Sequence, residues 1–178
     1  HIETKQLQLN KIDFNPLELL SGLYEDFNNK KQLIDKEHIQ LILQKPEYSD
    51  IQIQNDYTRI NEIFTILLDN AFKFTKKGWV EFGYTLETNG INFYVKDSGI
   101  GIPLDKQQII FKSFAQADKS IRQVFGGLGV GLSIVLGLVN ILDGEISINS
   151  EVNRGTEITF SLPFDTAIQE KKPYNLAK

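Results

Sequence analysis

Residues 69–75 (DNAFKFT) combine an amide and an ammonium group at helical spacing. Asn70 lies three residues after Leu67 and four before Phe74, which places it on the apolar face of a helix, where an unpaired amide costs roughly 1–3 kcal/mol. An amide oxygen suits Mg²⁺, and Lys73 brings a positive charge to the same side. The segment predicts a site for a metal-bound polyphosphate. A backbone-bonded Asn beside a solvated Lys is the alternative.

Two further segments are rich in glycine. In residues 97–103 (DSGIGIP), Asp97 ends an expected strand, and Gly99 and Gly101 let the backbone approach a ligand closely. The carboxylate can accept a hydrogen bond from an amine such as that of adenine, or it can simply close a turn. In residues 125–134 (FGGLGVGLSI), glycines lead into an apolar helix whose first N–H groups form an anion site. A dinucleotide fingerprint and a Gly-Lys-Ser/Thr phosphate loop both fit this run poorly.

The spacing of apolar residues predicts the elements that position these segments. Helices are expected from Pro16 to the NNKK run, over residues 56–75 and 130–142, and as a short patch at residues 107–114. Strands are expected near residues 12–14, 39–43, 79–86, 91–96, 145–150 and 156–162. This order indicates an α+β two-layer sandwich, with a mixed sheet that carries its helices on one face.

Composition excludes several classes of protein. The chain has 178 residues, a formal net charge of −4, no Cys and no Met. The charge has the wrong sign for binding nucleic acid, and the lack of Cys excludes disulfides and Cys-ligated metals. The longest apolar stretch, residues 124–142, is interrupted by glycines and does not read as a membrane span. Because the chain opens at His1 without Met, we expect it to be part of a longer protein.

The order of the segments resembles the ATP-binding catalytic domain of sensor histidine kinases of the hybrid two-component type, within the GHKL ATPase superfamily. NAFKFT resembles the N-box, DSGIGIP the first glycine box, IIFKSFAQAD the phenylalanine box, GGLGVGLSI the second glycine box and RGTEITF the closing motif. The resemblance implies a Bergerat-type fold with a mostly antiparallel sheet. It assigns residues 1–11 to a linker from upstream dimerisation helices, 12–163 to the catalytic domain, with a lid at about 102–126, and 164–178 to a tail or linker.

The resemblance also implies a role for each candidate site residue. Asn70 would ligate Mg²⁺, Lys73 would reach the phosphates, and Asp97 would read the adenine amine. The reaction would be γ-phosphoryl transfer from ATP to a histidine, with Mg²⁺ as the metal. The other nucleotide contacts would come from the glycine boxes, the lid and the closing motif, namely Gly99, Gly101, Ile102, Phe114, Gly127, Leu128, Gly129, Val130, Gly131, Leu132 and Thr156.

Two positions depart from the family pattern and keep an alternative open. Ile66 stands where the N-box normally has a second Asn, and Leu128 stands where the second glycine box commonly has Thr or Ser. A nucleotide-binding pseudokinase or regulatory module with weak or no phosphotransfer is therefore the alternative to an active kinase. Another GHKL branch, such as an anti-sigma-factor kinase or a topoisomerase ATPase, fits the residues of the N-box and the phenylalanine box less well.

Neither histidine fits the family's phosphoacceptor motif. His1 is terminal, and His38 is expected at the surface of the strand around residues 39–43. The acceptor would lie upstream, on a dimerisation domain, so the chain alone is expected to bind ATP without autophosphorylation. The resemblance further implies a receiver domain and a homodimeric parent as partners, and no nucleic acid. It places the domain in the cytoplasm and leaves open whether the parent is anchored in the inner membrane.

Overall fold

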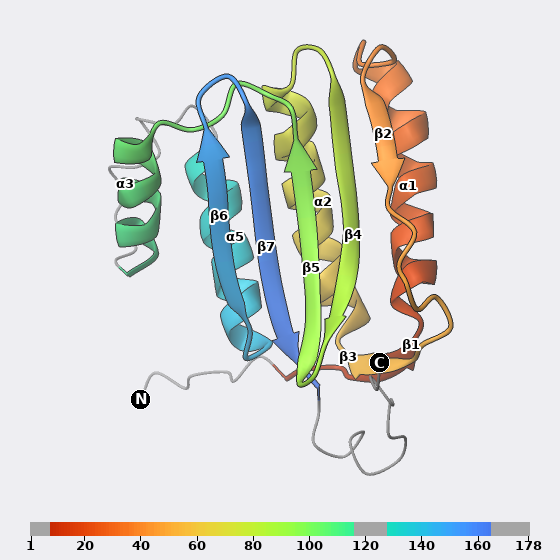
Figure 1. Cartoon of the computed structure of the whole chain (residues 1–178). Coiled ribbons are helices and arrows are strands. Elements are labelled where there is room, and N and C mark those ends of the chain that lie inside the picture. The colour runs from red at the N-terminus through yellow and green to blue at the C-terminus, as the bar shows by residue number, and fades with distance from the viewer. Residues whose placement is uncertain (1–7, 116–127, 165–178) are drawn as a thin grey trace.

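The structure is a computed structural model that describes residues 8–115 and 128–164. Helices α1, α2 and α5 lie on one face of a five-stranded sheet, and α3 lies beyond the β6 edge (Figure 1). The elements, in chain order, are β1 (Ile12–Phe14), α1 (Pro16–Leu33), β2 (Gln40–Leu43), β3 (Ile53–Asn55), α2 (Tyr57–Phe74), β4 (Trp79–Glu87), β5 (Gly90–Asp97), α3 (Leu104–Ala115), α5 (Leu128–Ile141), β6 (Glu145–Glu151) and β7 (Gly155–Pro163).

The main sheet has the strand order β2-β4-β5-β7-β6. β2 runs parallel to β4, and the other neighbouring pairs are antiparallel. β1 and β3 form a separate antiparallel ribbon in which Phe14 pairs with Ile53. The predicted α+β sandwich with a mixed, mostly antiparallel sheet is therefore confirmed. The sequence analysis did not predict β3, which is three residues long.

Helix α2 is the central helix of this layer. Its N-cap is Asp56, whose side chain accepts a hydrogen bond from the backbone N–H of Arg59 at 3.1 Å. The fully buried Phe64 ring packs against three strands, with ring centroids 6.1 Å from Phe82, 5.5 Å from Phe93 and 5.4 Å from Phe160. These rings belong to β4, β5 and β7, so the aromatic cluster fixes α2 over the middle of the sheet.

His38 was expected on a strand, and this prediction is wrong. The N–H of Ile39 bonds the carbonyl of Lys36 at 3.0 Å, which closes a turn that contains His38, and β2 begins only at Gln40. The Nε2 atom of His38 lies 2.7 Å from the carbonyl oxygen of Lys76. His38 therefore lies in the turn before β2, and the apolar alternation of residues 39–43 predicted the start of the strand one residue too early.

In the part of the chain that is described, no helix has the length and hydropathy needed to cross a membrane.

Leu68 and Leu33 provide a matched test of the buried helix face. Leu68 in α2 is 0% exposed, whereas Leu33 at the end of α1 is 86% exposed. Leu68→Ala is expected to lower the free energy of unfolding by about 2–5 kcal/mol because it leaves a cavity. Leu33→Ala is expected to change it by at most about 0.5 kcal/mol. Urea unfolding measures both, and equal losses would contradict the described packing of α2.

Candidate functional site

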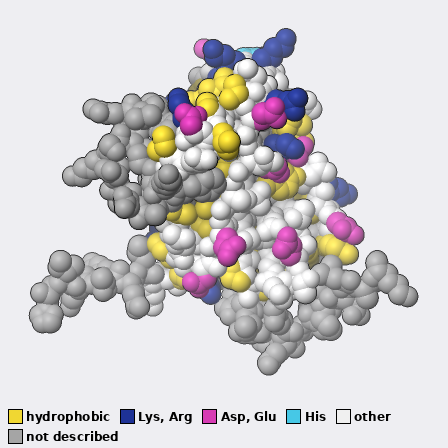
Figure 2. Space-filling model, turned by 60° about the vertical axis from the view of Figure 1, so that its left-hand side comes forward, with side chains coloured by type: hydrophobic (Ala, Val, Ile, Leu, Met, Phe, Trp, Pro, Cys, Tyr) yellow, Lys and Arg dark blue, Asp and Glu magenta, His cyan; other side chains and the backbone are white. Residues whose placement is uncertain are grey.

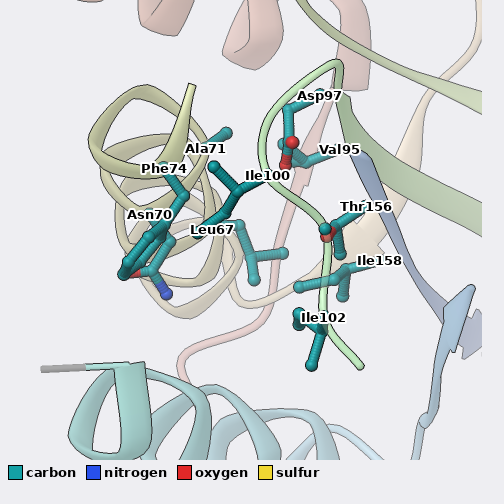
Figure 3. Close-up of a pocket in the computed structure, with 11 residues that line it drawn as sticks. Leu67, Asn70, Ala71, Phe74, Val95, Asp97, Ile100, Ile102, Thr156 and Ile158 are labelled. Atoms are coloured by element: carbon teal, nitrogen blue, oxygen red, sulfur yellow. The ribbon is translucent and has the colours of Figure 1, made fainter. Parts of the chain in front are cut away.

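A pocket opens where the C-terminal end of α2 faces the end of β5 and the start of β7 (Figure 3). Its volume, with the open mouth included, is about 450 Å³. The walls are mainly apolar, with three polar side chains among them. The lining residues are Leu67, Asn70, Ala71, Phe74, Val95, Asp97, Ile100, Gly101, Ile102, Thr156 and Ile158.

Asp97 is ionisable, and among the described residues that line the pocket no other side chain is. It is the last residue of β5, pairs with Thr156 of β7, and accepts a hydrogen bond from the N–H of Gly99 at 2.8 Å. Burial raises the pKa of Asp97 from 3.8 to about 6, while the backbone hydrogen bonds from Gly99 and Thr156 act in the opposite direction. The carboxyl group therefore both closes a turn, as the alternative interpretation predicted, and lines the pocket.

Gly99 and Gly101 serve close approaches between backbone segments. A Cβ on Gly99 would lie 2.5 Å from the carbonyl oxygen of Phe74 at the end of α2. Gly101 has a φ of 69°, and a Cβ there would collide with the carbonyl of Glu151. The sequence predicted that both glycines let the backbone approach a ligand. The structure places Gly101 in the pocket wall, whereas Gly99 lies outside the lining and packs against α2.

A polar network that the sequence did not predict holds the pocket wall to α3. The N–H of Ile102 donates to Ser150 Oγ at 2.8 Å, and Ser150 Oγ lies 2.8 Å from Thr156 Oγ1. The side-chain amide of Gln107 donates to the carbonyls of Ile102 and Ser150 at 2.5 and 2.8 Å. Gln107 is 8% exposed, and its place three residues before buried Ile110 was a signal for a buried polar contact.

Asn70 lines the pocket from α2, whereas Lys73 lies at its border. The Asn70 side chain is partly buried, and its Nδ2 atom is fully buried without a hydrogen-bond partner. In Figure 3 this amide nitrogen points from α2 toward the helix below it, α5. Lys73 is exposed, and its Nζ atom lies 5.3 Å from the centroid of the Phe74 ring, which lines the pocket. The ammonium group of Lys73 therefore lies over a ring that lines the pocket, although Lys73 itself is not a lining residue.

Lysines gather at the end of the molecule where α1 and α2 terminate (Figure 2). Lys30 and Lys31 lie in the last turn of α1, and Lys73 lies in the last turn of α2. The Nζ atom of Lys36 donates to the carbonyl of Thr75 at 2.8 Å. Positive charges near helix C-termini are stabilised by the helix dipole, so the fold itself accounts for this cluster.

The second glycine box is described only in part. Gly127 and residues 116–126 of the expected lid lie outside the described residues, and residues 104–115 of that lid form α3. Leu128, Gly129, Val130 and Gly131 form the first turn of α5, whose N–H groups lack helical acceptors. For Phe114 and residues 128–130 only the backbone is described. Leu132 is 1% exposed and belongs to the core.

The family model for histidine kinase-, DNA gyrase B- and HSP90-like ATPases matches residues 55–166. The chain belongs to this family. The solved catalytic domain of histidine kinase ThkA, in a nucleotide-free form, superposes with a TM-score of 0.70 at 22% identity, over 87% of this chain and 96% of that domain. Full-length ShkA in complex with AMPPNP superposes with a TM-score of 0.75 at 26% identity, over 90% of this chain and 32% of ShkA. The predicted GHKL fold is confirmed.

Curated relatives are sensor kinases. The chain is 35% identical to the autoinducer 2 sensor kinase/phosphatase LuxQ of Vibrio vulnificus, over 98% of this chain and 21% of LuxQ. It is 32% identical to the circadian input-output histidine kinase CikA of Synechococcus elongatus, over 97% of this chain and 23% of CikA. The chain thus spans about a fifth of the length of these relatives. The predicted class, an ATP-binding catalytic domain of the sensor histidine kinase type, is confirmed.

The raised pKa of Asp97 has a measurable effect on stability. Because the folded state binds this proton more tightly than the unfolded chain, the stabilisation is complete below pH 3.8 and is lost as the pH rises through about 6. Asp97→Asn should therefore become more stable relative to wild type as the pH rises across this window, and the difference should be constant above it. Urea unfolding at several pH values measures this. Asp26→Asn, on the exposed side of α1, controls for removal of a charge.

Proposed function

We propose that this chain positions Mg-ATP for transfer of the γ-phosphoryl group to a histidine on an upstream dimerisation domain of a hybrid sensor histidine kinase. The observation that carries the proposal is the pocket, in which α2, β5 and β7 bring Asn70, Asp97 and Thr156 together. Membership in the ATPase family and similarity to proteins named sensor kinases support it.

The apolar end of the pocket suits a purine base. Val95, Ile102 and Ile158 provide apolar contact area in the same pocket as the Asp97 carboxylate. Since the pKa of Asp97 is about 6, this group is mainly ionised at neutral pH. It can then accept a charge-assisted hydrogen bond from the exocyclic amine of adenine. Thr156 adds a hydroxyl group to the same wall.

The other end suits phosphates and Mg²⁺. Among residues 8–115 and 128–164, no three His, Cys, Asp or Glu side chains are placed to hold a metal. A metal at this end would be held by the Asn70 oxygen, by phosphate oxygens and by water, a combination that suits Mg²⁺. The buried nitrogen of Asn70 has no protein partner, whereas buried structural amides are normally satisfied, so this amide is not committed to a structural hydrogen bond through its nitrogen. Its oxygen would be the atom that holds the metal. Bound Mg²⁺ would neutralise phosphate charge, and Lys73 would add a positive charge at the border.

A nucleotide-binding pseudokinase or regulatory module is the second candidate. The observation that favours it is Ile66, whose side chain packs against the core four residues before Asn70 and offers no polar group there. Such a module would hold the nucleotide with weak or no phosphotransfer. In either case we propose a homodimeric parent in which a receiver domain and the dimerisation domain are partners, with this domain in the cytoplasm.

Asn70 and Asn61 test the metal assignment. Both lie on α2, but they are nine residues apart and therefore on opposite sides of the helix. The wild-type chain should bind ADP or ATP more tightly with Mg²⁺ than with EDTA in calorimetry. Asn70→Ala should remove this gain because the amide ligand is lost, and Asn61→Ala should keep it. A Mg²⁺ gain that survives in Asn70→Ala would contradict the ligand assignment, and a flat wild-type titration at millimolar nucleotide would contradict the function.

Phosphotransfer separates the two candidates. The chain alone should acquire no acid-labile phosphate from labelled ATP, because the acceptor histidine is expected upstream. A longer protein that carries the upstream helices should autophosphorylate if the first candidate is right. If activity appears only after Ile66→Asn, the pseudokinase proposal holds instead. Acid-labile label on the chain alone would contradict the expected position of the acceptor.

A further inference from the structure

Gly131, in the first turn of α5, lies directly against the side chains of Ile66 and Asn70. A Cβ on Gly131 would lie 3.0 Å from Ile66 Cγ2, 3.4 Å from Asn70 Nδ2 and 3.8 Å from Asn70 Oδ1. Ile66 and Asn70 are four residues apart on α2 and are therefore neighbours on one side of that helix. The backbone of α5 thus covers both side chains at a point where no Cβ fits without displacing a neighbour.

These groups have little freedom to move apart. Phe64 holds α2 against three strands of the sheet, and Leu67 and Leu68 of the same helix are at most 1% exposed. Ile66 is β-branched, so its χ1 angle is restricted within a helix. A methyl group added at position 131 would therefore press on Ile66, which lies beside Asn70, or force α5 away from α2.

On its buried side, the orientation of the Asn70 amide is limited mainly by packing against neighbouring side chains. Its Nδ2 atom is buried and has no hydrogen-bond partner, so no hydrogen bond to this nitrogen holds the amide in one orientation. The oxygen and the nitrogen of a side-chain amide have similar shapes, so either can occupy the same space. To bind a metal, however, the amide must turn its oxygen toward the ion. The surfaces of Ile66 and Gly131 limit where the amide group can lie.

We propose that the Ile66–Gly131 contact positions the Asn70 amide for nucleotide-bound metal. Ile66 and Gly131 are positioning residues, because they act through Asn70. The inference rests on the proposed function, in which Asn70 is the metal ligand. Gly131 contributes because it has no side chain, which leaves room for the amide of Asn70. Ile66, although apolar, supports Asn70 by packing where the family pattern has a second Asn.

Gly137 offers a matched control on the same helix. A Cβ on Gly137 would meet nothing within 4 Å, and the residue is exposed. Gly137→Ala and Gly131→Ala therefore share the gain in helix propensity, and only the second change alters the contact with Asn70. A difference between the two variants reports on that contact.

Nucleotide affinity with Mg²⁺ and with EDTA tests the proposal. Gly131→Ala is expected to reduce the Mg²⁺-dependent gain, which is the ratio of the affinity with Mg²⁺ to the affinity with EDTA, about tenfold, as is usual for residues that support a metal ligand. Gly137→Ala should leave both values unchanged. The double variant that combines Ile66→Ala with Gly131→Ala should recover the Mg²⁺-dependent gain in nucleotide affinity, because the smaller side chain makes room for the new methyl group. Adding Ile66→Val should not, because valine keeps a branched Cβ at this position.

The side-chain amide signal of Asn70 in nucleotide-free protein, followed by ¹⁵N NMR, is the second readout. It should shift in Gly131→Ala, return in the double variant with Ile66→Ala, and stay unchanged in Gly137→Ala. An unshifted signal with an intact Mg²⁺ gain in folded Gly131→Ala would overturn the proposal. If Gly131→Ala fails to fold, Ile66→Ala alone should shift the signal, and an unshifted signal there would overturn it equally. A wild-type chain without any Mg²⁺ gain would refute the proposed function, and the NMR comparison would still test the contact.

Discussion

Burial of one face of α2 against the sheet is the constraint on which the rest of the structure depends. Phe64 contacts aromatic rings of three strands, and Leu67 and Leu68 are at most 1% exposed. Because a helix is rigid along its length, fixing this face also fixes Asn70 at the edge of the same stripe. The register of β5 and β7 sets Asp97 beside Thr156 in the same way. The burial that stabilises the domain therefore also builds the pocket.

The pocket keeps polar groups in an environment that disfavours them. Burial raises the pKa of Asp97 to about 6, so its charge at neutral pH lowers the stability of the nucleotide-free domain. The buried nitrogen of Asn70 lacks a partner, which also costs free energy. Buried polar groups that lack a partner or carry a charge in an apolar environment are typical of binding sites. A ligand that supplies a donor to Asp97 and an acceptor to the Asn70 amide nitrogen offsets these costs.

The glycines illustrate how one residue type can serve two purposes. Their clustering in sequence predicted loops and a helix start that wrap a ligand. In the structure Gly99 makes room for the carbonyl of Phe74, Gly131 makes room for two side chains of α2, and a Cβ on Gly155 would collide with the carbonyl of Asp97. These close approaches bring helix ends and strand ends near enough to enclose a small pocket. Glycine thus shapes the site even where it does not line it.

The sequence by itself determined the elements and the ends at which chemistry could occur. Apolar periodicity placed Asn70 on the buried stripe of α2 and Asp97 at the end of a strand, because such patterns report geometry within one element. Only the tertiary structure decided which distant segments meet, including Gln107 with Ser150 and Gly131 with Asn70. The raised pKa of Asp97 likewise arises from burial by other segments. Contacts of this kind depend on strand order and helix packing, which local spacing does not encode.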